Sequence, residues 1–202
     1  MYNKKAWHNK KAWLTFATIS AMALLMSSAY AQNSEIATQA HSQGKPKAVD
    51  AIDVQKYAGT WYEVARLPMY FQRNCVSDVQ AKYSLNADKT IRVNNQCMNR
   101  EGELDVSEGI AYPQNDGNSQ LKVSFLPKGL RWVPFSKGDY WVLRVDEDYQ
   151  VALVGGPSHR YLWLLSRIPD VDEAVIEDYL NTAKAQGYDL SKLIRTKHSY
   201  EK

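Results

Sequence analysis

The stretch DYWVLRVDEDYQVALVGGP (residues 139–157) decides the fold. Its two apolar parts, 139–145 and 149–155, are separated by Asp-Glu-Asp, and the second ends in Gly-Gly-Pro. Apolar runs of this length between turn-forming residues are typical of β-strands, and a three-residue connection makes the two strands antiparallel neighbours. The same pattern continues on both sides of this stretch.

Alternating apolar and polar residues, broken by turn residues, run from position 59 to position 167. Eight strands are expected, at residues 59–66, 75–85, 90–97, 107–112, 119–126, 139–145, 149–155 and 160–167. Eight antiparallel strands can hide their edges by closing into an up-and-down β-barrel, whose interior has room for one small ligand. The predicted fold class is therefore all-β.

The periodicity changes once, after the last strand. Apolar residues then recur at intervals of three and four, between Asp170 or Asp172 as the N-cap and Gly187 as the stop. We expect one helix over about 171–186, packed on the outside of the barrel. Barrel and helix together define a predicted domain over residues 50–202.

The N-terminus has the organisation of a secretory signal over residues 1–31. Four lysines precede the apolar run Ala12–Met26, which is short for a membrane span, and Ala-Tyr-Ala at 29–31 suits signal peptidase. A retained anchor helix is the alternative. Residues 32–49 are polar and lack periodicity, which predicts a flexible leader. Gln32 follows the predicted cleavage site, where a lipid anchor would require a cysteine.

The predicted secreted part is nearly neutral. The formal charge of +3 includes four lysines within the first 31 residues, and without them 21 basic side chains face 22 acidic ones. A nucleic-acid-binding protein would need a basic excess, so no nucleic-acid partner is expected. We also expect no cofactor.

Both cysteines, Cys75 and Cys97, lie in the predicted secreted part. Two thiols in an oxidising compartment favour one disulfide, and a hairpin centred on residue 86 would place them opposite each other. The alternative is a free nucleophilic cysteine, although no histidine is near either thiol in sequence. The histidines are widely scattered, so no zinc site is expected.

Signature residues occur in the first and last predicted strands. These strands carry Gly-Thr-Trp-Tyr-Glu at 59–63 and Tyr-Leu-Trp-Leu-Leu-Ser-Arg at 161–167, and Asp146 and Tyr149 flank the sixth turn. Together with the strand count, they resemble the signatures of the lipocalin family over about residues 50–196. The segments FSKGDYWVL and VALVGGP resemble the bacterial branch of that family, with its outer-membrane lipocalins.

The expected barrel has an open and a closed end. The long connections 67–74, 98–106 and 127–138 fall at one end, which we take as the mouth. The resemblance implies that Trp61 and Arg167 pack together at the closed end in a structural role, and a guanidinium on an indole face is favourable.

The side chains expected inside the barrel are mostly apolar or aromatic, which suits an acyl chain. For strands 139–145 and 160–167 both faces are apolar, and the inward face is taken from the resemblance. The candidate ligand-binding residues are Val79, Ala81, Tyr83, Val93, Asn95, Ala111, Val123, Phe125, Tyr140, Val142, Arg144, Tyr161 and Trp163. Plain core packing is the alternative, above all near the floor. An inward Arg144 would need a ligand or a buried acid as its partner.

Cations and apolar residues gather around the predicted mouth. The cations are Arg73, Arg100, Lys128, Arg131, Lys137 and Arg160, and the apolar loop residues are Met69, Tyr70, Phe71, Leu130, Trp132 and Phe135. This favours an anionic amphiphile and an anionic membrane surface. We expect the 127–138 loop to act as a lid that dips into the bilayer interface. Solvated charges and simple capping of the core are the alternatives.

The resemblance and the apolar interior predict a binding protein without catalytic residues. It would hold a fatty acid, lysophospholipid or similar amphiphile in the bacterial envelope, for storage, transport or membrane maintenance. We expect a periplasmic monomer or homodimer that contacts the outer membrane reversibly. The alternatives are an isomerase or de-epoxidase on the same fold, because fold does not fix function, and a carrier of a pigment such as a tetrapyrrole.

Overall fold

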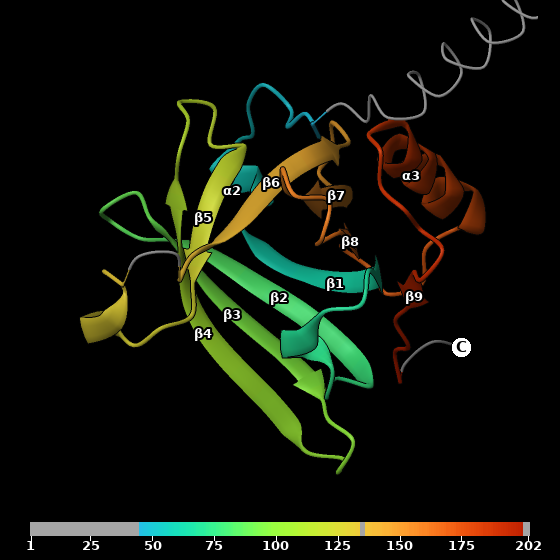
Figure 1. The fold of residues 1–202 in the computed structure, drawn as a ribbon, viewed down its shortest axis with the longest axis horizontal. Helices are drawn as coiled ribbons and strands as arrows, with labels where there is room; N and C mark the ends of the chain where they lie inside the picture. Colours follow the sequence, from blue (N-terminus) through green and yellow to red (C-terminus); the bar gives the residue numbers. More distant parts are fainter. Residues whose placement is uncertain (1–44, 134–135, 200–202) are drawn as a thin grey trace, which may run out of the picture. The chain divides into compact units, whose positions relative to one another are not determined.

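The computed structural model describes residues 45–133 and 136–199 (Figure 1). The predicted signal and the leader up to residue 44 lie outside these residues. The helices are α2 (Val54–Tyr57), α3 (Glu173–Ala185), and the 3-10 turns η1 (Tyr70–Gln72) and η2 (Lys128–Leu130). The strands are β1 (Gly59–Arg66), β2 (Ser77–Leu85), β3 (Ile91–Met98), β4 (Leu104–Pro113), β5 (Gln120–Ser124), β6 (Gly138–Val145), β7 (Val151–Gly155), β8 (Trp163–Ser166) and β9 (Ile194–Arg195).

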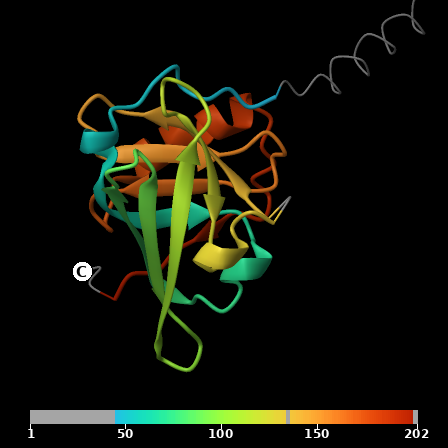
Figure 2. The ribbon, with the colours of Figure 1, turned by 90° about the vertical axis from the view of Figure 1, so that its left-hand side faces the viewer.

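Strands β1 to β8 form a closed antiparallel barrel, which confirms the predicted fold. Each strand pairs with the next in sequence, and β1 pairs with both β8 and β2 to close the sheet. The mouth is the end that carries the β1–β2, β3–β4, β5–β6 and β7–β8 connections. In Figures 1 and 2 the β3–β4 connection projects farthest from the barrel.

Alternation along the strands produces one apolar cluster inside the barrel and another outside. In β2, Ala81 and Tyr83 are buried inside while Lys82 and Ser84 are exposed. The outer cluster joins α3 to the outer faces of β1, β6, β7 and β8, and Figure 1 shows α3 beside β7 and β8. The helix therefore packs outside the barrel, as predicted.

The predicted ends of this helix are also confirmed. The Asp172 carboxylate accepts a hydrogen bond from the backbone N–H of Ala174 at 2.8 Å, which makes Asp172 the N-cap. Gly187 follows the C-terminal end with a φ of 88°, a left-handed conformation that glycine adopts without steric cost.

Two β-bulges change which side chains face inward. The pairing of β1 with β8 shifts between Glu63 and Ala65, and that of β6 with β7 shifts between Val142 and Arg144. Each bulge adds one residue to the strand, so the alternation reverses beyond it.

The bulge in β6 corrects the predicted place of Arg144. Arg144 lies opposite Leu153, a member of the outer cluster, and its guanidinium reaches Asp178 of α3 at 2.6 Å. Its guanidinium also lies 4.1 Å from the ring centre of Tyr179. Arg144 therefore fastens the helix to the outside of the barrel, and its predicted inward, ligand-binding position is wrong.

The β2–β3 hairpin is centred two residues farther along the chain than predicted, so most residues of β2 have a partner four positions from the predicted one. Tyr83 opposes Val93 and Ala81 opposes Asn95, because the turn closes between Asn86 and Thr90 and centres the hairpin on residue 88. The pairing also shifts between Ser77 and Gln80. The predicted disulfide nevertheless forms.

The C-terminal segment 194–199 fills the seam between β1 and β2 at the mouth. β1 pairs with β2 only from Gly59 to Tyr62, and farther along the same edge of β1 pairs with β9. The N–H of Asp78 in β2 donates to the carbonyl of Lys197 at 2.8 Å. The barrel wall is thus completed at the mouth by residues 130 positions away in sequence from β1.

Residues 45–49 correct the end of the predicted leader. Ala48 is buried, and the N–H of Val49 donates to the carbonyl of Val142 in β6 at 2.8 Å. This last part of the predicted leader is therefore held against the barrel.

Candidate functional site

The floor of the barrel is closed by the short helix α2 and by Arg167. The Arg167 guanidinium lies 3.9 Å from the ring centre of Trp61, whose side chain is fully buried. It also donates four hydrogen bonds of 2.6–3.1 Å to backbone carbonyls, those of Lys56, Ala58, Thr60 and Tyr149. The structure thus brings Trp61 and Arg167 together at the closed end.

Eight of the candidate ligand-binding residues belong to the interior cluster. The buried members are Ala81, Tyr83, Val93, Ala111 and Val142, and the partly exposed members are Val123, Tyr140 and Trp163. The three partly exposed members lie toward the mouth ends of β5, β6 and β8.

Four further candidate ligand-binding residues are not members of the interior cluster. Phe125 and Tyr161 lie at the mouth ends of β5 and β8. Asn95 faces inward beside Ala81, and its Oδ1 atom is buried without a hydrogen-bond partner. Val79 is buried in the irregular part of β2 but belongs to neither cluster.

Three tyrosine hydroxyls meet in the lower interior. Tyr140 donates to the Tyr83 hydroxyl at 3.0 Å, and the Tyr57 and Tyr140 hydroxyl oxygens are 2.9 Å apart. Burial raises the pKa of Tyr83 to about 12 and raises the pKa values of Tyr57 and Tyr140 further. All three phenols are therefore neutral at physiological pH and present hydroxyl groups rather than charges.

An aromatic ladder connects these tyrosines to the mouth. It consists of Tyr57, Tyr83, Tyr140, Trp163, Tyr161 and Phe71, whose successive ring centres are 5.5–6.4 Å apart. Rings at these separations form favourable contacts with one another and offer flat apolar faces to a ligand. Phe71, at the top, is 54% exposed.

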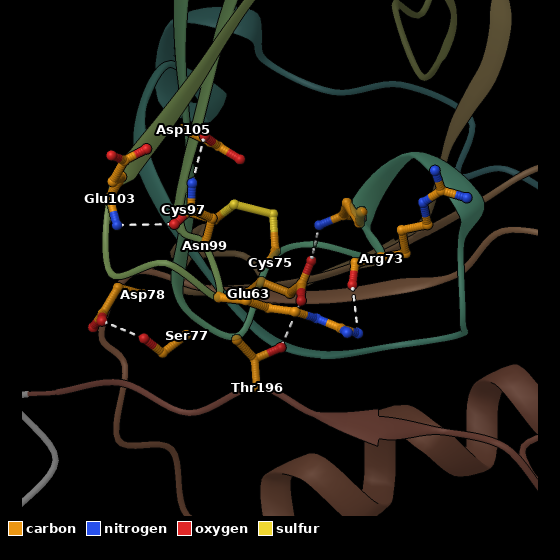
Figure 3. The surroundings of a disulfide bond; sticks show 12 residues. Glu63, Arg73, Cys75, Ser77, Asp78, Cys97, Asn99, Glu103, Asp105 and Thr196 are labelled. Carbon is orange, nitrogen blue, oxygen red and sulfur yellow. Dashed lines mark hydrogen bonds between the residues drawn. A yellow bond between two sulfur atoms is a disulfide. The ribbon is translucent and has the colours of Figure 1, made fainter.

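A charged cluster lies on the β1 wall of the mouth half. Glu63 and Arg66 are 2% and 7% exposed, and Arg66 Nε is 3.1 Å from Glu63 Oε1. Glu63 Oε2 accepts from the Gln72 side chain at 2.8 Å, and Oε1 accepts from the Thr196 hydroxyl at 2.5 Å. Figure 3 shows Glu63 with Thr196, whose hydroxyl donates to it. Burial is the main cause that raises the pKa of Glu63, against the effect of its hydrogen bonds and of Arg66.

The disulfide lies next to this cluster (Figure 3). Cys75 and Cys97 are bonded, with their Cα atoms 5.6 Å apart, and thereby tie the β1–β2 connection to the mouth end of β3. These are the only two cysteines of the chain. The predicted disulfide is confirmed, and neither thiol is free to act as a nucleophile while the bond is intact.

Most of the large apolar side chains exposed by the described residues surround the mouth. We call this set the rim: Tyr70, Phe71, Val76, Leu104, Val106, Phe125, Leu130 and Trp132. Tyr70 and Trp132 are 80% and 76% exposed. Met69, by contrast, is buried. Phe135, the other predicted loop residue, lies outside the described residues.

Two surface hollows lie outside the barrel. One of about 450 Å³ lies between α3 and β9, and another of about 470 Å³ lies between residues 45–50 and Trp141. The first is lined mostly by charged and amide side chains, and the second by backbone segment 45–50 and polar side chains. Neither coincides with the candidate ligand-binding residues.

Residues 52–198 match the family model described as a lipocalin-like domain. The chain belongs to the lipocalin family. This lipocalin is 42% identical over 157 residues to temperature-induced lipocalin-1 of Arabidopsis thaliana, covering 76% of this chain and 83% of that protein. It is 40% identical over 148 residues to outer membrane lipoprotein Blc of Escherichia coli K12, covering 72% of this chain and 79% of that protein.

Solved structures agree on the fold. Insecticyanin of Manduca sexta superposes with a TM-score of 0.58 at 20% identity, covering 78% of this lipocalin and 86% of that chain. Lobster apocrustacyanin A1 gives a TM-score of 0.55 at 17% identity, covering 71% and 78%. At such identities the similarity concerns the fold alone.

The part of the chain that the structure describes lacks two kinds of feature. No group of three or more His, Cys, Asp or Glu side chains there could hold a metal ion. No helix of that part of the chain is long and apolar enough to cross a membrane.

The sequence analysis missed Tyr57, Glu63, Arg66 and Gln72 as interior residues. The inward position of Glu63 could have been predicted, because Glu63 lies two positions after the inward Trp61 on the same strand. Arg66 faces inward only because of the bulge at Val64, and no residue pattern marks that bulge. Tyr57 and Gln72 lie on short helical turns that periodicity does not detect.

Proposed function

We propose that this lipocalin is a non-catalytic carrier that holds an amphiphile, such as a fatty acid or a lysophospholipid, in the mouth half of its barrel. The observation that carries the proposal is the aromatic ladder, whose upper members are partly exposed and end at an apolar rim. An acyl chain lying along such a ladder would remove apolar surface from water on both partners. The charged cluster beside Trp163 would contact the headgroup.

Blocking the mouth half tests this proposal. Val123 faces inward and is partly exposed, so Val123→Trp should fill the space that the acyl chain needs. We expect the variant to lose about tenfold or more in affinity for a fluorescent fatty acid, since a large side chain would replace the ligand. Lys82→Trp, on the exposed face of β2, is the control and should bind normally. Equal affinity of both variants and the unmodified protein would contradict the proposal.

The enzyme alternative makes a different prediction. An isomerase or de-epoxidase would need an activated cysteine or an acid/base pair within reach of the substrate. The disulfide bond supports the carrier, since it occupies both thiols. Two thiols that react with an alkylating agent under non-reducing conditions would favour the enzyme, and visible absorbance of the purified protein would favour a pigment carrier.

We further propose that the rim contacts anionic membranes. Its exposed aromatic and aliphatic residues alternate with Arg73, Arg100, Lys128 and Arg131 in the same connections, and this combination suits an anionic bilayer interface. Tyr70→Ala combined with Trp132→Ala should reduce co-sedimentation with phosphatidylglycerol-containing vesicles. Ile168→Ala, which removes a side chain that is 59% exposed beyond β8, is the control. Unchanged co-sedimentation of the double variant would refute membrane contact through the rim.

A periplasmic location is consistent with the secretory pattern, the disulfide and the similarity to outer membrane lipoproteins. Lipoproteins are acylated on cysteine, and both cysteines of this chain are bonded to each other. We therefore propose reversible rather than anchored membrane contact. Metabolic labelling with a radioactive fatty acid should leave the protein unlabelled, and a labelled protein would exclude this arrangement.

A further inference from the structure

Arg66 is a buried cation in the mouth half of the barrel. The bulge at Val64 turns the Arg66 side chain inward. The Cα atom of Arg66 lies opposite that of Trp163, a ladder residue next to the charged cluster. Only 7% of the surface of Arg66 is exposed. A guanidinium carries five N–H donors and stays charged at any physiological pH, so its burial needs acceptors.

The chain supplies too few acceptors for this guanidinium. Glu63 is its ion-pair partner, but only through the Nε edge, and that Nε atom makes no hydrogen bond of adequate geometry. Among the described residues, none accepts a hydrogen bond from the two terminal nitrogens of Arg66. The terminal nitrogens of Arg66, which can bind a carboxylate or a phosphate through two parallel hydrogen bonds, are therefore unused.

Glu63 is not available to a ligand. Its two oxygens already accept hydrogen bonds from Gln72 and Thr196, and it is 2% exposed. Burial raises its pKa, so the folded protein favours the neutral carboxyl more than water does. The groups that this cluster leaves for a ligand are therefore the terminal N–H donors of Arg66.

We propose that Arg66 binds the anionic group of the ligand, a carboxylate or a phosphate, through its terminal nitrogens, while the acyl chain lies along the upper part of the aromatic ladder, from Trp163 past Tyr161 to Phe71 at the rim. This rests on the proposed carrier function and narrows its ligands to amphiphiles with an acidic headgroup. The indole N–H of Trp163 donates a hydrogen bond to the Gln72 side chain at 2.9 Å, and Gln72 in turn donates to Glu63, the ion-pair partner of Arg66. One hydrogen-bond network therefore positions both the Arg66 guanidinium and the Trp163 ring.

The test compares acidic and neutral amphiphiles that have the same chain. The probes are oleate and oleoyl lysophosphatidic acid against oleyl alcohol and monooleoylglycerol. The unmodified protein should bind the acidic probes at least about tenfold more tightly, as expected for charge-assisted hydrogen bonds in a dry site. Arg66→Gln should abolish that preference and leave the affinity for the neutral probes within about twofold. Tighter binding of oleate or of the phosphate probe would tell which headgroup the site prefers.

Two variants separate recognition from packing. Arg92→Gln removes one positive charge from the exposed face of β3 and should keep the preference for acidic probes. Arg66→Lys keeps the charge but loses the two-pronged geometry, and should give an intermediate preference. Equal losses for acidic and neutral probes in Arg66→Gln would overturn the proposal, because that is the signature of packing.

The unmodified protein alone also tests the inference, should Arg66→Gln fail to fold. Equal affinity for oleate and oleyl alcohol would overturn the role of Arg66 and leave the carrier function standing. Failure to bind any of the four probes would instead contradict the carrier function itself.

Discussion

Arg167 and Arg66 lie at opposite ends of the same barrel, and their surroundings differ. The Arg167 guanidinium covers Trp61 and donates to four backbone carbonyls. The Arg66 guanidinium faces one carboxylate through its Nε edge and has no other partner among the described residues. The chain thus satisfies the cation that closes the floor and leaves donors unused on the cation near the mouth. Donors left unused on an interior cation remain available to a ligand.

Removing Arg167 should have the largest effect on stability. Arg167→Gln loses the contact with Trp61 and leaves backbone carbonyls at the floor without donors, which should cost about 4 kcal/mol. Arg66→Gln should cost less, about 1–2 kcal/mol, because Glu63 keeps two other hydrogen bonds and can take up a proton instead of remaining a buried charge without its cation. Urea denaturation measures both values. Similar losses for the two variants would mean that Arg66 is as structural as Arg167.

The disulfide is expected to contribute slightly less. It closes a loop of 22 residues at the mouth, so the Cys75→Ser and Cys97→Ser double variant should lose about 3 kcal/mol at most on the chain-entropy model. The loss will be smaller if the β2–β3 hairpin persists in the unfolded chain. Reducing agent should lower the midpoint of the unmodified protein to that of the variant and leave the variant unchanged. A reductant-insensitive midpoint would show that the bond does not stabilise the mouth.

Arg144 sharpens the distinction between the inside and the outside of the barrel. Its ion pair with Asp178 is largely exposed, so Arg144→Ala should cost about 1 kcal/mol or less. Affinity for oleate should not change, because the side chain lies between the barrel and α3. Fluorescence titration with both proteins measures this, and a loss of oleate binding would put Arg144 back among the ligand contacts.

The pH dependence of stability should reveal the buried Glu63 by a small effect. Its pKa in the folded protein is raised above the ordinary 4.5, so the folded state holds this proton more firmly than the unfolded state. The unmodified protein should therefore lose stability relative to Glu63→Gln as the pH rises from 4.5 through the raised pKa. The difference between the two unfolding free energies, measured across that range, should favour the variant increasingly. A difference independent of pH would mean that the pKa of Glu63 is not raised.

Period-two patterning was sufficient to predict the eight strands, since each strand buries one face. The helix and its two ends followed from the three-and-four spacing between Asp172 and Gly187. The inward face of β6 could not be predicted in this way. Trp141, Val142 and Leu143 are all apolar, so the sequence carries no mark of the bulge that turns Arg144 outward.

The candidate site was predictable where alternation is strict and unpredictable where tertiary contacts decide. Ala81, Tyr83 and Val93 were placed inside correctly, although the hairpin partners were wrong by four residues. Such a shift keeps every side chain on its own face, because the period of a strand is two. The charged cluster was missed because it depends on a bulge in β1 and on Thr196, which lies more than a hundred residues away.

Native mass spectrometry of the protein isolated from its own cell envelope tests the carrier function most directly. The account predicts a bound molecule that, after extraction, proves to be an amphiphile with a carboxylate or phosphate group. Protein that carries no such molecule, and that also fails to take up added oleate, would contradict it.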